Sequence, residues 1–156
     1  MFPGVYYDGK AVYVTEAVKL EKNFYTQKTY IRRAHISSSR EDYLEMIARL
    51  CEKCGYARIS DVAQRLNVSV SSVSKTAALL KEEGYINYEK YGVITLTEKG
   101  KAKGFYLLKR HDILNRFFCY VNSSADELDL TEQIEHYIDE TTVQNLEKLL
   151  HKLIKN

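Results

Sequence analysis

Residues 60–96 constrain the fold more than any other stretch, because two short amphipathic helical patterns are followed there by two β-type runs. Ser60 is placed to cap the first helix and Ser69 the second, which is expected to run to Glu83 before Gly84. The buried face of the second helix is expected to hold apolar residues at helical spacing: Val70, Val73, Ala77 and Leu80. This pattern predicts a helix-turn-helix.

A β-hairpin is expected directly after the second helix. Residues 85–88 and 93–96 are rich in β-branched and aromatic residues, and a short glycine-containing segment separates them. The side chains expected to contact duplex DNA lie on the second helix and at the hairpin tip: Ser69, Ser71, Ser72, Ser74, Lys75, Thr76, Lys90 and Tyr91. A serine-rich face is also compatible with plain solvent exposure. The hairpin favours DNA binding, because it completes a winged helix-turn-helix.

The charges divide the chain into a basic front and an acidic back. Residues 1–39 carry six Lys/Arg against three Asp/Glu, which gives a net charge of +3. Residues 40–110 carry thirteen against nine, a net +4, and residues 111–156 carry four against nine, a net −5. This asymmetry indicates a surface for a polyanion followed by a pocket for cations.

The segment Glu132-Gln133-Ile134-Glu135-His136 gathers two carboxylates and an imidazole on one face of an expected helix. At about 100° of rotation per residue, the three polar side chains fall within roughly 100° of one another. The opposite face, where a core is expected, holds Leu130, Ile134, Tyr137 and Ile138. Two carboxylates at this spacing repel, so a divalent cation is the simplest explanation. A solvated polar face would give the same pattern.

Two other helices offer possible metal ligands. The helix expected to open at Ser37 and end at Gly55 carries Asp42 and Glu45 beside its buried stripe. His111 lies midway along a long helix expected from Thr97 to about Val121. Taken singly, each of these residues is more simply interpreted as an ordinary surface or core residue.

The C-terminal part, residues 98–156, is too small to bury all of its own apolar surface. Its last helix is expected to present an apolar stripe of Val143, Leu146, Leu149, Leu150 and Leu153. A second copy of the chain would cover this surface, and a homodimer also fits the two-fold geometry of duplex half-sites.

Residues 1–36 form an extension of unknown role. The Asp8-Gly9 pair between Tyr/Val-rich runs predicts a hairpin within residues 5–14. Thr15 is placed to cap a short helix with Ala17, Leu20 and Phe24 on one face. Whether this region is an ordered appendage or a loose arm stays open.

No apolar run approaches the roughly 18 residues that span a bilayer, and residues 1–10 lack the features of a signal peptide. The chain is therefore expected to be cytoplasmic, with no membrane partner and with reduced cysteines. Cys51 and Cys54 have CxxC spacing, but no second pair nearby completes a zinc site. These two residues and Cys119 are expected to be core residues.

Residues 38–156 resemble the diphtheria-toxin-repressor family of metal-dependent regulators, and within it the manganese-responsive branch, the manganese transport regulators. The matching segments are Glu41-Asp42-Tyr43-Leu44-Glu45, residues 56–61, Ser71-Ser72-Val73, residues 88–91, Arg110-His111 and Ile134-Glu135-His136. The resemblance implies metal ligands at Asp42, Glu45, His111, Glu132, Glu135 and His136, with two Mn(II) ions per subunit bridged by Glu132 and Glu135. Iron-responsive relatives have a methionine where this chain has Asp42, and a carboxylate there favours Mn(II).

The resemblance also implies the fold and the function. The expected fold is mainly α with a small β wing: a winged helix-turn-helix DNA-binding domain over residues 37–97, then a helical metal-binding and dimerisation domain over residues 98–156. The expected function is Mn(II)-dependent repression of metal-ion uptake genes by a homodimer bound to palindromic duplex DNA. The alternative is a winged-helix regulator that senses Fe(II) or a non-metal ligand. A di-iron enzyme is disfavoured, because its sites need Glu-x-x-His on two helices.

Overall fold

The computed structural model describes residues 5–7, 10–12, 36–89 and 92–154. Residues 1–35 and residues 36–156 are separate units. In the first unit, β1 (Val5–Tyr7) pairs antiparallel with β2 (Lys10–Val12), as the hairpin prediction requires. The helix expected after Thr15 lies outside the described residues.

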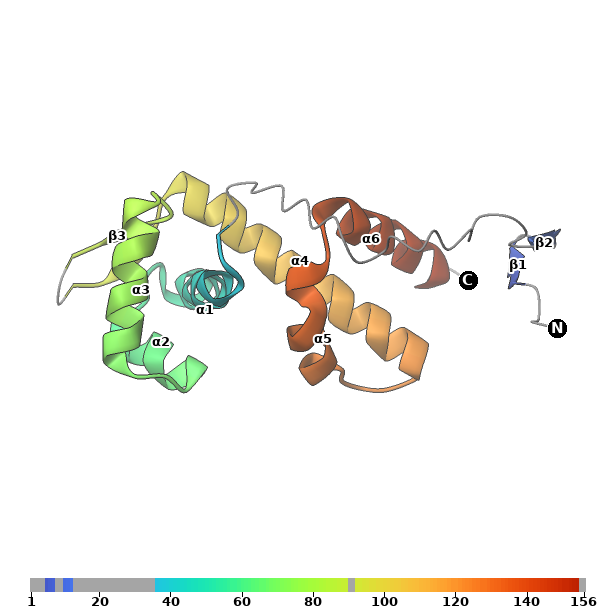
Figure 1. Ribbon diagram of the computed structural model, residues 1–156, viewed down its shortest axis with the longest axis horizontal. Helices are drawn as coiled ribbons and strands as arrows, with labels where there is room; N and C mark the ends of the chain where they lie inside the picture. Colours follow the sequence, from blue (N-terminus) through green and yellow to red (C-terminus); the bar gives the residue numbers. More distant parts are fainter. Residues whose placement is uncertain (1–4, 8–9, 13–35, 90–91, 155–156) are drawn as a thin grey trace, which may run out of the picture. The chain divides into compact units, whose positions relative to one another are not determined.

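The larger unit begins with three helices (Figure 1). α1 spans Ser38–Cys54 and ends at Gly55, which has a φ of 79° that suits glycine. α2 (Ile59–Leu66) and α3 (Val70–Glu82) follow. The turn between them passes through Asn67, which has a φ of 52° in the left-handed region that asparagine tolerates. These three helices form the predicted helix-turn-helix with its supporting helix.

The prediction that Ser60 caps α2 is wrong. α2 begins at Ile59, so its N-cap is Arg58, two residues before Ser60, and the Ser60 hydroxyl donates instead to Oδ1 of Asp61 at 3.0 Å. Ala57, two residues before the helix, exchanges backbone hydrogen bonds of 2.9 and 2.8 Å with Ile94. This bridge joins residues that are far apart in the sequence, so the local sequence pattern could not predict that α2 starts two residues after Ala57.

Ser69 caps α3 as predicted, since its Oγ accepts a 3.1 Å hydrogen bond from the backbone N–H of Ser72. The core of this part lies among α1, α2, α3, the wing and the start of α4. Its fully buried members are Leu44, Ile47, Val62, Val73, Leu80, Ile86, Ile94 and Leu107. Val70 is not on the buried face as predicted: it is 57% exposed, and it lines a cavity between α3 and the wing.

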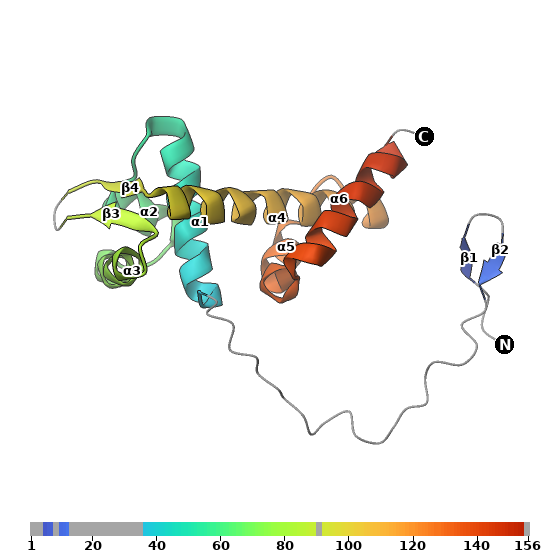
Figure 2. The same cartoon turned by 90° about the horizontal axis from the view of Figure 1, so that it is seen from above.

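The wing is confirmed (Figure 2). β3 (Ile86–Tyr88) and β4 (Ile94–Leu96) pair antiparallel, with Tyr88 opposite Ile94. One face of this hairpin is anchored, because Ile94 is fully buried. The hairpin tip with Lys90 and Tyr91, expected to contact DNA, lies outside the described residues.

The C-terminal part is built on one long helix that starts beside the wing (Figures 1 and 2). α4 spans Glu98–Asn122, and Thr97 caps it by accepting the N–H of Gly100 at 3.0 Å. α1 packs against α4, and so do α5 (Leu128–Ile134) and α6 (Glu140–Ile154). A second, smaller core joins α4 to α6, with buried residues Ile113, Val143 and Leu150.

The prediction of one continuous α-helix through Glu132–His136 is wrong. α5 ends at Ile134, and the chain tightens into a 3₁₀ turn, η1 (Glu135–Tyr137). A 3₁₀ turn advances about 120° per residue, so the α-helical phase no longer holds. Glu135 is consequently buried at 3% exposure, while Tyr137, expected in the core, is 87% exposed.

The cysteines are less buried than expected. Cys54 is exposed in the last turn of α1, so its predicted core position is wrong, and Cys51 and Cys119 are half-buried. Among the described residues, none of the helices combines the length and apolar character that crossing a membrane requires.

Because Gly100 has no side chain, the first turn of α4 can lie directly against the backbone of Tyr85, just before the wing. A Cβ at this position would collide with the backbone carbonyl oxygen of Tyr85, which has no rotamer by which to move away. Gly100→Ala should lower the free energy of unfolding by about 1–3 kcal/mol, as overpacking does. Urea denaturation followed by circular dichroism measures this change. The exposed neighbour variant Lys101→Ala should stay within about 0.5 kcal/mol of the wild type, and equal stability of the two variants would contradict the prediction.

Candidate metal centre

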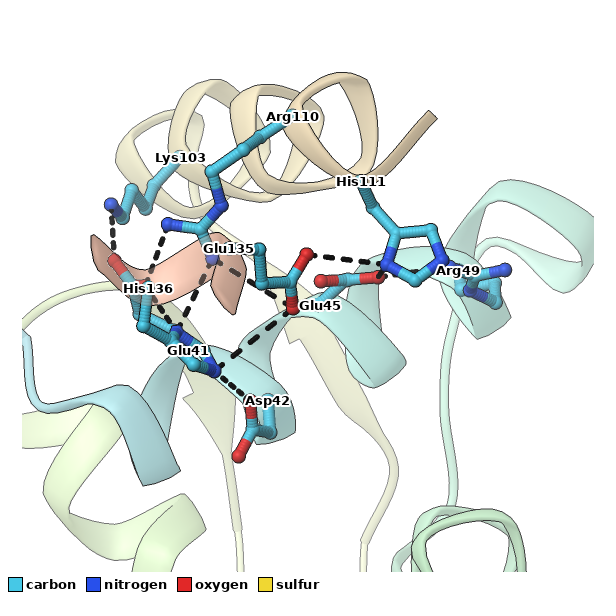
Figure 3. A network of polar contacts seen from close by, with 9 residues as sticks. All are labelled: Glu41, Asp42, Glu45, Arg49, Lys103, Arg110, His111, Glu135 and His136. Carbon is cyan, nitrogen blue, oxygen red and sulfur yellow. Dashed lines mark hydrogen bonds and ion pairs between the residues drawn. The ribbon is translucent and has the colours of Figure 1, made fainter. Parts of the chain in front are cut away.

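Five of the six predicted ligands converge where α1, α4 and η1 meet (Figure 3). They form two groups, and within each group the possible ligand atoms all lie within 4.8 Å of one another. The first group consists of Asp42, Glu135 and His136, and the second of Glu45, His111 and Glu135. Glu135 belongs to both.

The two oxygens of the Glu135 carboxylate face different groups. Its Oε1 lies 4.0 Å from Nε2 of His136, which is itself 2.9 Å from Oδ1 of Asp42. Its Oε2 lies 3.2 Å from Nδ1 of His111, which is 3.9 Å from Oε1 of Glu45. A carboxylate placed in this way can bridge two cations, each completed by a second carboxylate and an imidazole.

Glu132, the sixth predicted ligand, lies apart from these groups. It is exposed on α5, and it belongs to neither group of close donor atoms. It does line the same cavity of about 550 Å³, together with all five grouped residues. Of the two carboxylates that the resemblance implied as bridges, Glu135 is the one that lies between the two groups in this structure.

A positive charge in the site would stabilise the ionised carboxylates. Burial raises the pKa of Glu45, and the neighbouring charge of Glu135 raises it further. Burial also raises the pKa of Asp42 against the opposing effect of His136. The hydrogen bond to Glu135 raises the pKa of His111. Burial and the neighbouring carboxylates thus both act against the ionised forms of Asp42 and Glu45, although Arg49 pairs with Glu45 at 2.8 Å, and a divalent cation would stabilise the ionised forms. Oxygen and imidazole donors suit Mn(II) or Fe(II).

A buried ion-pair cluster beside the site was missed in the sequence. Glu41 lies in the first turn of α1 and is only 6% exposed. Its carboxylate accepts from Lys103 Nζ at 2.6 Å and from Arg110 Nη1 at 3.0 Å, and it lies 3.0 Å from His136 Nδ1. Burial alone would raise the pKa of Glu41, but these three partners outweigh it and lower the pKa. One sequence signal was present: Glu41 lies four residues before Glu45, on the same helix face.

The residues predicted to contact DNA are not equivalent in the structure. Ser71 and Lys75 are exposed on α3, as is the cap residue Ser69, whereas Ser74 and Thr76 are half-buried. The Ser72 hydroxyl is hydrogen bonded at 2.8 Å to the hydroxyl of Tyr43 on α1. Ser72 therefore connects α3 to the helix that carries two of the candidate metal ligands.

Two family models match consecutive parts of the chain. The model for the N-terminal DNA binding domain of iron dependent repressors matches residues 35–94. The model for their metal binding and dimerisation domain matches residues 97–156.

Named relatives agree with these matches. The HTH-type transcriptional regulator MntR of Lysinibacillus sphaericus (strain C3-41) is 36% identical over 119 residues, which cover 76% of this chain and 86% of the relative. MntR of Bacillus subtilis (strain 168) is 38% identical over 113 residues, covering 72% and 80%.

Solved structures have the same fold. The manganese regulator SloR matches with a TM-score of 0.63 and 25% identity over 72% of this chain. IdeR of T. acidophilum matches with a TM-score of 0.62 and 23% identity over 75% of this chain, a likeness that shows the fold alone. The chain spans 53% of the SloR chain and 56% of the IdeR chain, about half of each.

The matches cover both halves of residues 36–156 and confirm the resemblance and the fold class predicted from the sequence. They assign the chain to transcriptional regulators that depend on a metal, and not to enzymes. This chain belongs to the iron dependent repressor family of metal-dependent transcriptional repressors.

Proposed function

We propose that this chain is a Mn(II)-responsive repressor that binds a palindromic duplex operator as a homodimer in the cytoplasm and controls genes for metal-ion uptake. The observation that carries the proposal is the meeting of two carboxylates from α1 with His111, Glu135 and His136. The relatives named MntR and the manganese regulator SloR support Mn(II) as the effector. The ligand types are also compatible with Fe(II), so both metals belong in the test.

Two ions per subunit follow from the proposed ligand groups. Each group offers two carboxylates and one imidazole, and the two groups share Glu135. When bound, the cations would supply the positive charge that crowded carboxylates need. Glu132, which lines the cavity, completes the proposed ligand set.

α1 links the proposed metal ligands to the recognition helix α3. The Tyr43 hydroxyl on α1 is hydrogen bonded to the Ser72 hydroxyl on α3 at 2.8 Å. Near the start of α1, Arg40 forms an ion pair with Glu83 at the end of α3. A restraint on the position of α1 relative to α4 is therefore also a restraint on α3. A coupling of about 1–3 kcal/mol would change DNA affinity about 5–150-fold.

The homodimer proposal rests on apolar surface in the C-terminal part and on the dimerisation domain that the family model names. Large apolar side chains there remain exposed: Phe105, Tyr120, Val121, Leu128, Tyr137 and Leu149. In a homodimer, two copies of α3 would read two half-sites of a palindrome. The domain boundary near residue 97 is likewise part of the proposal.

The shared carboxylate gives a prediction about metal stoichiometry. Wild-type protein should bind two Mn(II) ions per chain, because two groups of ligands are present. Asp42→Ala should remove one ion, whereas Glu135→Ala should remove both. Calorimetric titration of metal-free protein measures these numbers, and Glu52→Ala, an exposed carboxylate on α1, is the control. A full complement of two ions in Glu135→Ala would contradict the assignment.

The same ligands should control DNA binding. Mn(II) should tighten binding of the wild type to a fluorescent duplex from a metal-uptake promoter by about 5–150-fold. Glu135→Ala and His136→Ala should lose this stimulation, while sedimentation shows that each remains a folded dimer. Fluorescence anisotropy with Mn(II), Fe(II) and Zn(II) compares the metals. Unchanged operator affinity of the wild type on addition of Mn(II) would refute the proposed function.

Lys75 is expected to contact a DNA phosphate from the exposed face of α3. Lys75→Ala should weaken DNA binding without changing Mn(II) affinity. The slope of log K against log salt should become shallower by about 0.9, the value of one phosphate contact. Lys81→Ala, in the last turn of the same helix, should leave the slope unchanged. Equal slopes for both variants would remove Lys75 from the interface.

A further inference from the structure

We propose that Glu41, which is not among the metal ligands, is a positioning residue that fixes the ring orientation and tautomer of His136. The inference rests on the proposed function, because it gives His136 the role of a metal ligand. The position of Glu41 in the sequence, directly before Asp42, did not indicate that it orients a histidine.

The geometry around the imidazole ring carries the argument. His136 Nδ1 lies 3.0 Å from Oε2 of Glu41, and His136 Nε2 lies 2.9 Å from Oδ1 of Asp42. An ionised carboxylate only accepts hydrogen bonds, so contact with Glu41 requires that Nδ1 carry the proton. By the same rule the contact of Nε2 with Asp42 favours a proton on Nε2 when no cation is bound, and a cation held by Nε2, Asp42 and Glu135 would take the place of that proton.

Arg110 competes with Glu41 for the same ring nitrogen. Its Nη2 lies 3.3 Å from Nδ1 of His136. A guanidinium only donates, so an Arg110 bond to Nδ1 would require the opposite tautomer, with the proton on Nε2. A protonated Nε2 has no lone pair for a metal. A Glu41 carboxylate that keeps the proton on Nδ1 leaves Nε2 as the nitrogen that can give up its proton to a cation.

Glu41 is itself held from the α4 side. Lys103 and Arg110 both belong to α4, and each donates to a different oxygen of the Glu41 carboxylate. Arg110 is only 3% exposed, so this contact is protected from solvent. Glu41 therefore has a fixed carboxylate plane, and it transmits that orientation to His136 across the junction of α1, α4 and η1 (Figure 3).

Three variants separate positioning from general stability. Glu41→Ala removes the acceptor, Glu41→Gln keeps an acceptor oxygen without the charge, and Lys109→Met is the control, because it breaks an ion pair of α4 with Glu147 that involves neither Glu41 nor His136. Mn(II) affinity is measured from the electron paramagnetic resonance signal of the free ion, and folding from thermal unfolding of metal-free protein. Glu41→Ala should lose about 10–100-fold in Mn(II) affinity. Glu41→Gln should lose less, and Lys109→Met should stay within about threefold of the wild type.

A second measurement needs no variant. Long-range ¹H–¹⁵N correlation spectra of the metal-free wild type should show His136 protonated at Nδ1. A neutral ring protonated at Nε2 alone would overturn the inference. So would wild-type Mn(II) affinity in Glu41→Ala, or equal losses of affinity in Glu41→Ala and Lys109→Met. A wild type that binds no divalent cation would instead refute the proposed function, and the positioning role would fall with it.

Discussion

The electrostatic balance at the junction of α1 with α4 is the interaction on which the rest of the structure depends. Asp42, Glu45 and Glu135 bring negative charge together in a half-buried site, where Glu45 pairs with Arg49 and the other two carboxylates contact the histidines. Next to it, Glu41 is neutralised by Lys103 and Arg110 in a contact that needs no metal. The junction therefore has one side paired by Lys103 and Arg110 and one side that gathers the candidate metal ligands.

This arrangement explains how a small ligand can control a distant surface. The paired side keeps α1 and α4 in contact, so the acidic side does not have to assemble from separated parts. α1 is also tied to α3 through Tyr43 and Ser72 and through Arg40 and Glu83. Restraining one helix thus restrains the helix expected to enter the major groove. A modest free energy is sufficient, because only the relative position of packed elements has to change.

The features that were predicted correctly from the sequence are those that depend on a single residue and its neighbours along the chain. Gly55 and Ser69 were correctly interpreted as helix boundaries, because a positive φ and a capping hydroxyl are properties of single residues and their neighbours. The wing followed from β-type runs on either side of a turn. The start of α2 was misplaced because the bridge between Ala57 and Ile94 that precedes it is a tertiary contact. Tyr137 was misplaced because the change from α to 3₁₀ geometry after Ile134 altered the phase of the helix.

The candidate site was predicted less completely than the fold. The ligand set came from a resemblance, since each residue alone fits an ordinary surface. The Glu41–Arg110 pair was missed because its members are 69 residues apart, and no periodicity links them. Buried ion pairs of this kind are recognised only when the helices that carry them are placed side by side.

Anomalous scattering from a crystal grown with Mn(II) would test the central claim most directly. Data collected at the manganese absorption edge should show two peaks in the cavity, one at each group of ligands, with the Glu135 carboxylate between them. An acidic cavity without anomalous density, with Asp42 and Glu45 turned away from His136 and His111, would contradict the account.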